Sequence, residues 1–144
     1  MIRNLRTGAV ISREELHCRN PLSLALGLRF RRAQIAVLCL PKPRRVSLDM
    51  WFVFYSIDVL FLDERRKVVE IKRNLRPWRG YNPSTSWAYA VEIPSYRGVK
   101  NRHSKLDRFT FKRFLSMIRI SWFIEPISAE FCHYKARLGD KLQF

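Results

Sequence analysis

The chain has 144 residues and a formal net charge of +16, because 28 Lys and Arg residues stand against 12 Asp and Glu residues. Hydrophobic residues make up 47% of it and aromatic residues 13%, which is enough to build a core and excludes a disordered chain. The positive charge predicts attraction to polyanions or anionic surfaces. Most of this charge lies in residues 1–45 and 99–144, whereas residues 46–98 are nearly balanced.

The first 45 residues predict short strands and one helix. Residues 1–20 alternate loosely between apolar and polar positions, as in an edge strand and a turn. Pro21 opens a short helix that runs to Leu28, with Gly27 near its end. Residues 33–40 then predict a buried strand, which the two prolines of the segment PKPRR are expected to stop because proline cannot donate to a strand ladder.

The most apolar stretch runs from Met50 to Leu62. Its length and residue pattern favour a β-strand over a transmembrane helix. A transmembrane helix needs about 20 mostly apolar residues, and a central aspartate such as Asp58 opposes insertion. Ile57, Val59 and Phe61 alternate with residues 58, 60 and 62, so both faces are mostly apolar. We therefore expect residues 46–62 to form a strand covered on both sides, joined through residues 63–67 to a second strand at residues 68–71.

The rest of the chain predicts a loop, a strand, a helix and a closing hairpin. Residues 74–87 contain three turn-forming residues and read as a surface loop, followed by a strand at residues 88–93. Residues 104–123 predict an amphipathic helix that begins at a capping box, with Ser104 followed by Asp107. A turn at Gly139 and Asp140 leads into a last short strand. We expect one β-rich domain over residues 1–144, with an insertion at residues 99–136 that contains this helix.

Several motifs in chain order resemble the archaeal branch of the domain of unknown function 192 family. They are Gly27, Leu28, Phe30 and Arg31; Met50; Ile57, Asp58 and Phe61; Leu75, Pro77 and Trp78; the strand YAVEIP; and the closing LGDKLQF. The resemblance implies an all-β fold, a β-sandwich or barrel-like structure with one or two short helices, and it brings no settled activity. Arg29, Asp49 and Ser56 depart from the residues usual in that family.

Asp58 is the most distinctive single residue, because a carboxylate between apolar neighbours in a covered strand must be paired, hydrogen-bonded or protonated. We expect a structural carboxylate bonded to an arginine or to backbone donors. A catalytic acid or base is the alternative, although no second titrating group stands at a fixed spacing from it.

We expect neither a metal nor a cofactor. The pairs His17-Cys18 and Cys132-His133 have the residue types of a zinc site, but adjacent strand residues point to opposite faces. No glycine-rich phosphate loop is present. The three cysteines form no CxxC motif, which suits a reducing compartment and a cytoplasmic location.

Basic clusters provide the main indication of function. Arg29, Arg31, Arg32, Arg44 and Arg45 bracket one predicted strand, and Lys105, Arg108, Lys112 and Arg119 follow one side of the predicted helix. Such surfaces bind nucleic acid through counterion release, and Trp78, Tyr81 and Trp87 are candidates for stacking on exposed bases. The pattern predicts a non-enzymatic domain that binds nucleic acid or another polyanion weakly and without sequence preference.

Two alternatives belong to other classes of protein. One is a ligand-binding or hydrolase-like pocket that uses Asp58 together with an arginine. The other is docking of the amphipathic helix on a protein partner or an anionic membrane surface, for which a basic face opposite aromatic residues is typical.

Overall fold

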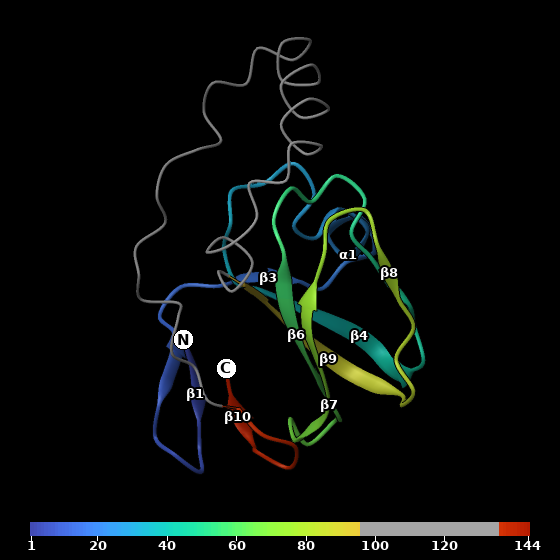
Figure 1. Cartoon of the computed structure of the whole chain (residues 1–144). Helices are drawn as coiled ribbons and strands as arrows, with labels where there is room; N and C mark the ends of the chain where they lie inside the picture. The colour runs from blue at the N-terminus through green and yellow to red at the C-terminus, as the bar shows by residue number, and fades with distance from the viewer. Residues whose placement is uncertain (96–135) are drawn as a thin grey trace, which may run out of the picture.

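The computed structural model describes residues 1–95 and 136–144 (Figure 1). Their elements are β1 (Ile2–Asn4), β2 (Val10–Ser12), β3 (Leu16–Cys18), α1 (Pro21–Leu26), β4 (Ala36–Arg44), β5 (Leu48–Asp49), β6 (Ile57–Leu62), β7 (Val68–Leu75), β8 (Gly80–Tyr81), β9 (Trp87–Pro94) and β10 (Leu142–Gln143). This content confirms the prediction of an all-β fold with a short helix. The predicted helix at residues 104–123 lies outside the described residues.

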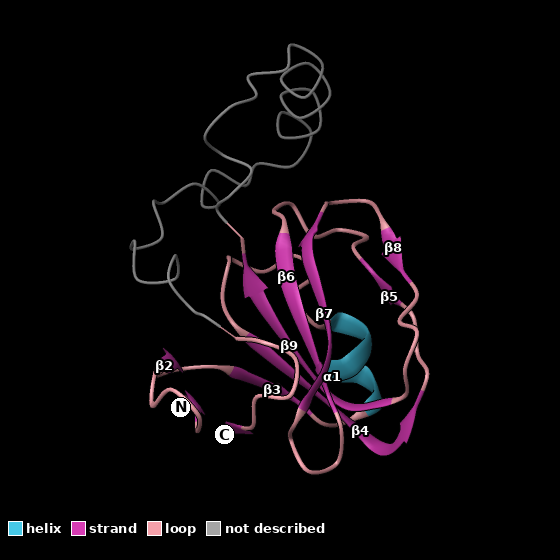
Figure 2. Cartoon of the chain, turned by 60° about the horizontal axis from the view of Figure 1, so that its bottom comes forward, coloured by secondary structure: helices cyan, strands magenta, loops and turns pink. Residues whose placement is uncertain are grey.

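A five-stranded sheet in the order β3-β4-β9-β6-β7 is the centre of the fold (Figure 2). β3 and β4 are parallel, and the other neighbours in this sheet are antiparallel. Two smaller sheets accompany it, one in the order β10-β1-β2 and one that pairs β5 with β8. In Figure 1, α1 and β8 lie on the opposite side of the large sheet from β1 and β10.

β6 is buried along its whole length, which confirms the strand with two apolar faces. Ile57, Val59 and Phe61 belong to the core cluster on the α1 side, where Trp87 and Met50 also lie. Leu60 and Leu62 belong to the second cluster, which packs against β1 and β10. β6 pairs with β7 through the predicted hairpin, and with β9 on its other edge.

α1 begins at Pro21, as its sequence predicts, and ends at Leu26, two residues before the predicted end at Leu28. Asn20 caps it, since its side-chain oxygen accepts a hydrogen bond from the Ser23 amide while the Ser23 hydroxyl accepts one from the Asn20 amide. Pro21 occupies the first turn, where its missing N–H leaves no intrahelical bond unmade. Gly27 follows the helix with φ of 43°, a conformation that glycine adopts without strain.

Three strand predictions were wrong in extent, and one of them is β7, which was predicted at residues 68–71 and extends to Leu75. Residues 46–56 do not continue β6: they contain only the short β5 and then a turn in which Phe52 has φ of 62°. β4 does not stop at the prolines but runs through Pro41 and Pro43 to Arg44. The ladder with β9 changes register between Cys39 and Arg44, and the prolines fall within this irregular stretch, where their missing N–H groups break no regular pairing.

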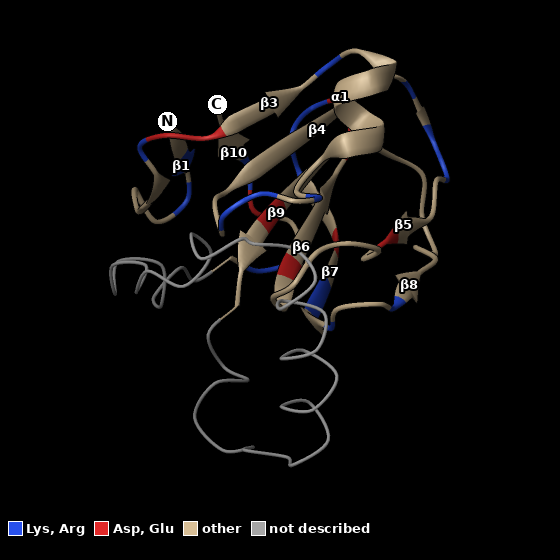
Figure 3. Cartoon of the chain, turned by 90° about the horizontal axis from the view of Figure 1, so that it is seen from above, with Lys and Arg blue, Asp and Glu red and all other residues tan. Residues whose placement is uncertain are grey.

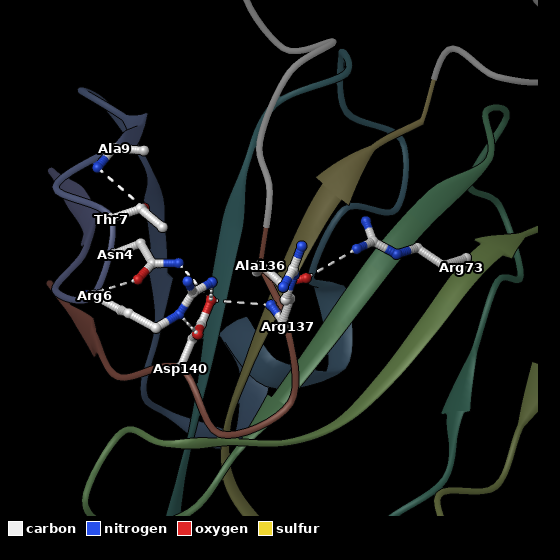
Figure 4. A network of polar contacts seen from close by, with 8 residues as sticks. All are labelled: Asn4, Arg6, Thr7, Ala9, Arg73, Ala136, Arg137 and Asp140. Carbon is white, nitrogen blue, oxygen red and sulfur yellow. Dashed lines mark hydrogen bonds and ion pairs between the residues drawn. The ribbon is translucent and has the colours of Figure 1, made fainter.

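The two ends of the chain are joined by the buried carboxylate of Asp140 (Figure 4). Its oxygens accept hydrogen bonds from the side chains of Asn4 and Arg6 and from the backbone amide of Arg137. β1 pairs with β10 beside this network, with Arg3 opposite Gln143. The predicted turn at Gly139 and Asp140 and the strand after it are confirmed.

Candidate nucleic-acid interface

Four exposed aromatic rings, Phe30, Trp51, Phe52 and Trp78, form a contiguous cluster that we call the aromatic platform. Their exposed fractions are 54%, 54%, 36% and 44%. Phe30 stacks on Phe52 at 4.8 Å between ring centroids, and Trp78 meets the edges of Phe52 and Trp51 at 5.6 and 5.7 Å. Large exposed apolar clusters are uncommon on monomeric proteins and mark sites of interaction.

Three of the four platform rings belong to residues whose backbone is in an unfavourable conformation. Five non-glycine residues of the described chain have positive φ, and three of them are Phe30, Phe52 and Trp78. A bulky residue in this region costs about 1 to 3 kcal/mol, and such strain concentrates at functional sites. The rest of the fold must therefore supply the free energy that keeps these rings at the surface.

Met50 anchors the segments that carry the platform. Its side chain is buried, and its carbonyl oxygen accepts a hydrogen bond of 3.1 Å from the Trp78 amide. The Met50 amide donates to the carbonyl of Arg79 at 2.9 Å, and the Phe30 amide donates to the carbonyl of Phe52 at 3.1 Å. Three segments that are distant in the sequence thus reach one surface through backbone hydrogen bonds.

Charge around the platform is strongly positive. The segments 28–32, 49–55 and 75–80 carry five arginines, which are Arg29, Arg31, Arg32, Arg76 and Arg79, and one acidic residue, Asp49. Arg29 donates from Nη2 to both oxygens of Asp49 at 2.7 Å. Arg31, Arg32, Arg76 and Arg79 are exposed. Arginine beside an aromatic ring suits a ligand that has both phosphate groups and planar bases.

Two of the three predicted stacking residues lie elsewhere. Trp87 is 1% exposed and its Nε1 donates to the carbonyl of Val46, so its ring is in the core and cannot receive a base. Tyr81 packs on Phe61, and its hydroxyl donates to Glu70 at 2.6 Å, an interaction that raises the pKa of Tyr81. Trp78 is the one of the three that belongs to the platform.

The predicted basic residues fall into two groups. Arg29, Arg31 and Arg32 flank the platform, whereas Arg44 and Arg45 lie at the end of β4, where the Nε of Arg45 donates to the carbonyl of Pro83. Lys105, Arg108, Lys112 and Arg119 lie outside the described residues, so their place relative to the platform stays a prediction.

Asp58 has the environment expected of a structural carboxylate. It is 3% exposed, and it accepts a hydrogen bond from Arg73 Nη1 at 3.0 Å and another from the Asn74 amide at 2.7 Å. It points away from the α1 side of the sheet, because Ile57 and Val59 point toward that side. β9 and β5 each carry one acidic residue (Figure 3), Glu92 and Asp49, and both line a cleft in the described structure. Asp58 does not line this cleft, and a pocket built on Asp58 stays a prediction.

The described residues form no metal centre. No group of three or more His, Cys, Asp or Glu side chains among residues 1–95 and 136–144 is placed to hold a metal ion. Cys18 is buried while His17 is exposed, as expected for neighbours in a strand. Burial is the main cause that raises the pKa of Cys18. Cys132 and His133 lie outside this part of the chain.

Sequence reasoning missed Phe30, Trp51 and Phe52 as surface residues. The covered strand expected over residues 46–62 includes Met50 to Tyr55, and apolar residues in a covered strand are expected to be buried. The signal that could have found them is the density of aromatic residues in a segment flanked by arginines.

The fold and these sites define a class, a small all-β domain built on a five-stranded mixed sheet with an exposed aromatic platform. The chain belongs to the DUF192 family, described as "Uncharacterized ACR", whose model matches residues 12–104. This match confirms the resemblance drawn from the motifs. Of those motif residues, Gly27, Leu28, Met50 and Ile57 line the cleft that also contains Glu92.

Archaeal proteins named UPF0127 are similar to this chain. The protein of Thermococcus sibiricus is 47% identical over 60 residues, which cover 40% of this chain and 38% of that protein. The protein of Pyrococcus horikoshii is 42% identical over 79 residues, which cover 53% of this chain and 66% of that protein. The protein of Pyrococcus furiosus is 33% identical over 99 residues, which cover 67% of this chain and 83% of that protein. The match thus spans well under half the length of the first of these relatives.

Two solved bacterial structures share the fold. A candidate transcription regulator from Sinorhizobium meliloti has a TM-score of 0.65 at 17% identity, covering 99% of this chain and 90% of that one. A protein of unknown function from Novosphingobium aromaticivorans has a TM-score of 0.58 at 15% identity, covering 90% and 74%. In the part of the chain that the structure describes, α1 is the one helix, and it is unsuited to crossing a membrane.

Proposed function

We propose that this domain is a non-enzymatic module that binds single-stranded nucleic acid, weakly and without sequence preference, at the aromatic platform. The single observation that carries the proposal is the cluster of exposed rings that three strained backbone positions keep at the surface. Base stacking on aromatic side chains is worth about 1 to 3 kcal/mol per base and tolerates any sequence, because every base has a π-face.

Charge complementarity supports a nucleic acid over an apolar partner. Arg31, Arg32, Arg76 and Arg79 are exposed next to the platform in sequence, and the whole chain carries +16. Phosphates neutralised by these side chains release counterions, which makes the affinity depend on salt. A purely apolar partner would need no such charge.

The test is a fluorescence anisotropy titration with a labelled oligothymidylate of about 20 nucleotides. Between about 50 and 200 mM salt we expect the affinity to fall about 10-fold or more, as for three or more neutralised phosphates. Trp78→Ala and Phe30→Ala should each weaken binding by roughly 5- to 100-fold, because each removes a ring on which a base stacks.

Two controls separate stacking from general charge attraction. Leu138→Ala removes an exposed apolar side chain that is 65% exposed and lies beside β10, so it should leave the affinity unchanged. Arg137→Gln removes one exposed charge next to Leu138, and it should weaken binding less than Arg31→Gln, which removes a charge beside the platform. Equal affinities for the wild type and Trp78→Ala, or an affinity independent of salt, contradict the proposal.

Docking of the predicted amphipathic helix on a partner or membrane surface remains a prediction, since residues 104–123 lie outside the described part of the chain. The oligonucleotide titration distinguishes it from the platform proposal, because a role confined to that helix leaves Trp78→Ala without effect.

A further inference from the structure

A cleft of about 660 Å³ lies between α1 and the five-stranded sheet. Its walls are largely apolar and come from separate elements, with Leu24 on α1, Leu38 on β4, Ile57 on β6 and Trp87 on β9. This volume is within the range of small-molecule sites, which are apolar clefts with a few placed polar groups.

Glu92 is the polar group at the sheet side of this cleft. It is 7% exposed and lines the cleft, and no described residue donates a hydrogen bond to its carboxyl group. Its neighbours across the ladders are Ala36 on β4 and Val59 on β6, both fully buried. A buried carboxyl group without a donor is unfavourable, so the fold keeps an unmatched acid facing an open volume.

Gly27 leaves that acid accessible. A Cβ atom at this position would lie 4.0 Å from Glu92 Oε2, so a longer side chain would extend into the space beside the carboxylate. Gly27 also has φ of 43°, which disfavours other residues. The glycine that ends α1 thus opens the cleft at its acidic end.

Several charged groups line the cleft together with Glu92. Burial, and to a smaller extent repulsion by Asp49 on β5, raises the pKa of Glu92 to about 7. Arg19, Arg29 and Arg44 line the same cleft, with Arg29 held by Asp49, and Cys18 lies on β3 in the same core cluster. Within residues 1–95 and 136–144, no arginine nitrogen lies within 4.0 Å of a Glu92 carboxylate oxygen.

We propose that this cleft binds a small organic amine with one positive charge, whose ammonium group pairs with the Glu92 carboxylate while its apolar body packs between α1 and the sheet. An ammonium group supplies the charge-assisted hydrogen bonds that Glu92 lacks. An anionic group placed beside the Glu92 carboxylate would be repelled by Glu92 itself and by Asp49. The arginines of the cleft disfavour a second positive charge on the ligand.

The test uses 1-hexylamine, 1-hexanol, hexanoate and 1,6-diaminohexane as probes. Binding of each probe is measured from amide chemical shifts in ¹H–¹⁵N NMR spectra of the full chain. Hexylamine should bind more tightly than the other three and shift amides around Glu92 and Gly27. Its affinity should rise about 10-fold or more from pH 5.5 to pH 8, because it needs the ionised carboxylate. Hexanoate affinity should fall over the same range.

Glu92→Gln preserves the size of the side chain and should abolish both the preference for the amine and its pH dependence. Glu64→Gln, at an exposed position of the β6–β7 hairpin, is the matched control and should change neither. The carboxyl carbon of Glu92, followed by ¹³C NMR, should titrate at lower pH when hexylamine is bound. Equal binding of hexylamine and hexanol, or unchanged binding by Glu92→Gln, overturns the proposal.

Discussion

Asp140 gathers four hydrogen-bond donors at the junction of the two chain ends. The Arg6 hydrogen bond is the main cause that holds its pKa well below the usual carboxyl range. A carboxyl group whose pKa is lowered by folding stabilises the protein above its unfolded pKa of about 3.9, and this contribution is lost as the pH falls toward the folded value.

We therefore expect Asp140→Asn to lower the free energy of unfolding by about 2 kcal/mol at pH 7, a typical value for hydrogen bonds to a charged group. The difference from the wild type should shrink as the pH falls below about 3.9. Urea unfolding at several pH values measures it. A difference that stays constant down to pH 2 would mean that Asp140 acts through packing and not through its charge.

Glu92 has the opposite pH dependence. Its pKa is raised to about 7 by burial and by Asp49, so folding favours its protonated form. The protein is most stable with respect to this group below the unfolded pKa of about 4.3, and stability is lost as the pH rises through about 7. Glu92→Gln should unfold like the wild type near pH 4 and be more stable at pH 8, by about 2 to 3 kcal/mol. Thermal and urea unfolding at both pH values check this.

Sequence reasoning identified Asp58 and overlooked Glu92, although both are acids in apolar strands. The two strands pair Asp58 with Ile93 and Val59 with Glu92, so the acids point to opposite faces. The two acids differ in their hydrogen-bond partners, because Arg73 on the neighbouring strand β7 donates a hydrogen bond to Asp58. A local pattern predicts that an acid is buried but not which distant residue reaches it.

At the scale of elements, β6 is the strand on which both core clusters depend. Leu60→Ala removes a side chain with no exposed surface and should lower the free energy of unfolding by about 2 to 5 kcal/mol, through lost burial and the cavity that remains. Leu22→Ala on α1, where the side chain is 71% exposed, should change it by less than about 0.5 kcal/mol. Urea unfolding compares the two variants, and similar losses would contradict the two-sided burial of β6.

β6 could be predicted because its alternation reports burial on both faces of one strand. The two segments that precede β6, the end of β4 and the turn at Phe52, were predicted less accurately. The strand through Pro41 and Pro43 depends on an irregular register with β9, and the turn at Phe52 depends on backbone hydrogen bonds from residues 30, 50 and 78–79. Both features arise from contacts between segments that no local pattern contains.

At the scale of the whole molecule, residues 95 and 136 are fixed near the same part of the sheet. The Ser95 amide donates to the carbonyl of Ser56, just before β6, and Arg73 joins Asp58 to the carbonyl of Ala136. Ala136, the last residue of the predicted insertion, is itself 4% exposed and belongs to the core.

Replacing residues 96–135 by a Gly-Ser linker of about 8 residues should therefore preserve the fold, because such a linker reaches about 25 Å. A shorter connection also has a slightly smaller entropic cost of closure. We expect one cooperative unfolding transition with a midpoint equal to or above that of the full chain, measured by circular dichroism. Loss of the cooperative transition would show that the predicted insertion is instead an integral part of the domain.

The platform belongs to this scale as well. Its rings come from three segments around residues 30, 52 and 78, and their approach depends on the packing of the whole domain. The sequence pointed to Trp78 and to Arg29, Arg31 and Arg32 as separate features, and only the tertiary structure brings Phe30 and Phe52 beside Trp78.

The pairing of β1 with β10 has a mechanical consequence. The strands are antiparallel, with Arg3 opposite Gln143 and Asn4 opposite Leu142, so a force applied to the two ends would load the hydrogen bonds of this pair one after another. Such a ladder unzips instead of shearing. Optical tweezers attached at residues 1 and 144 should therefore detach these strands at low force, before the central sheet ruptures.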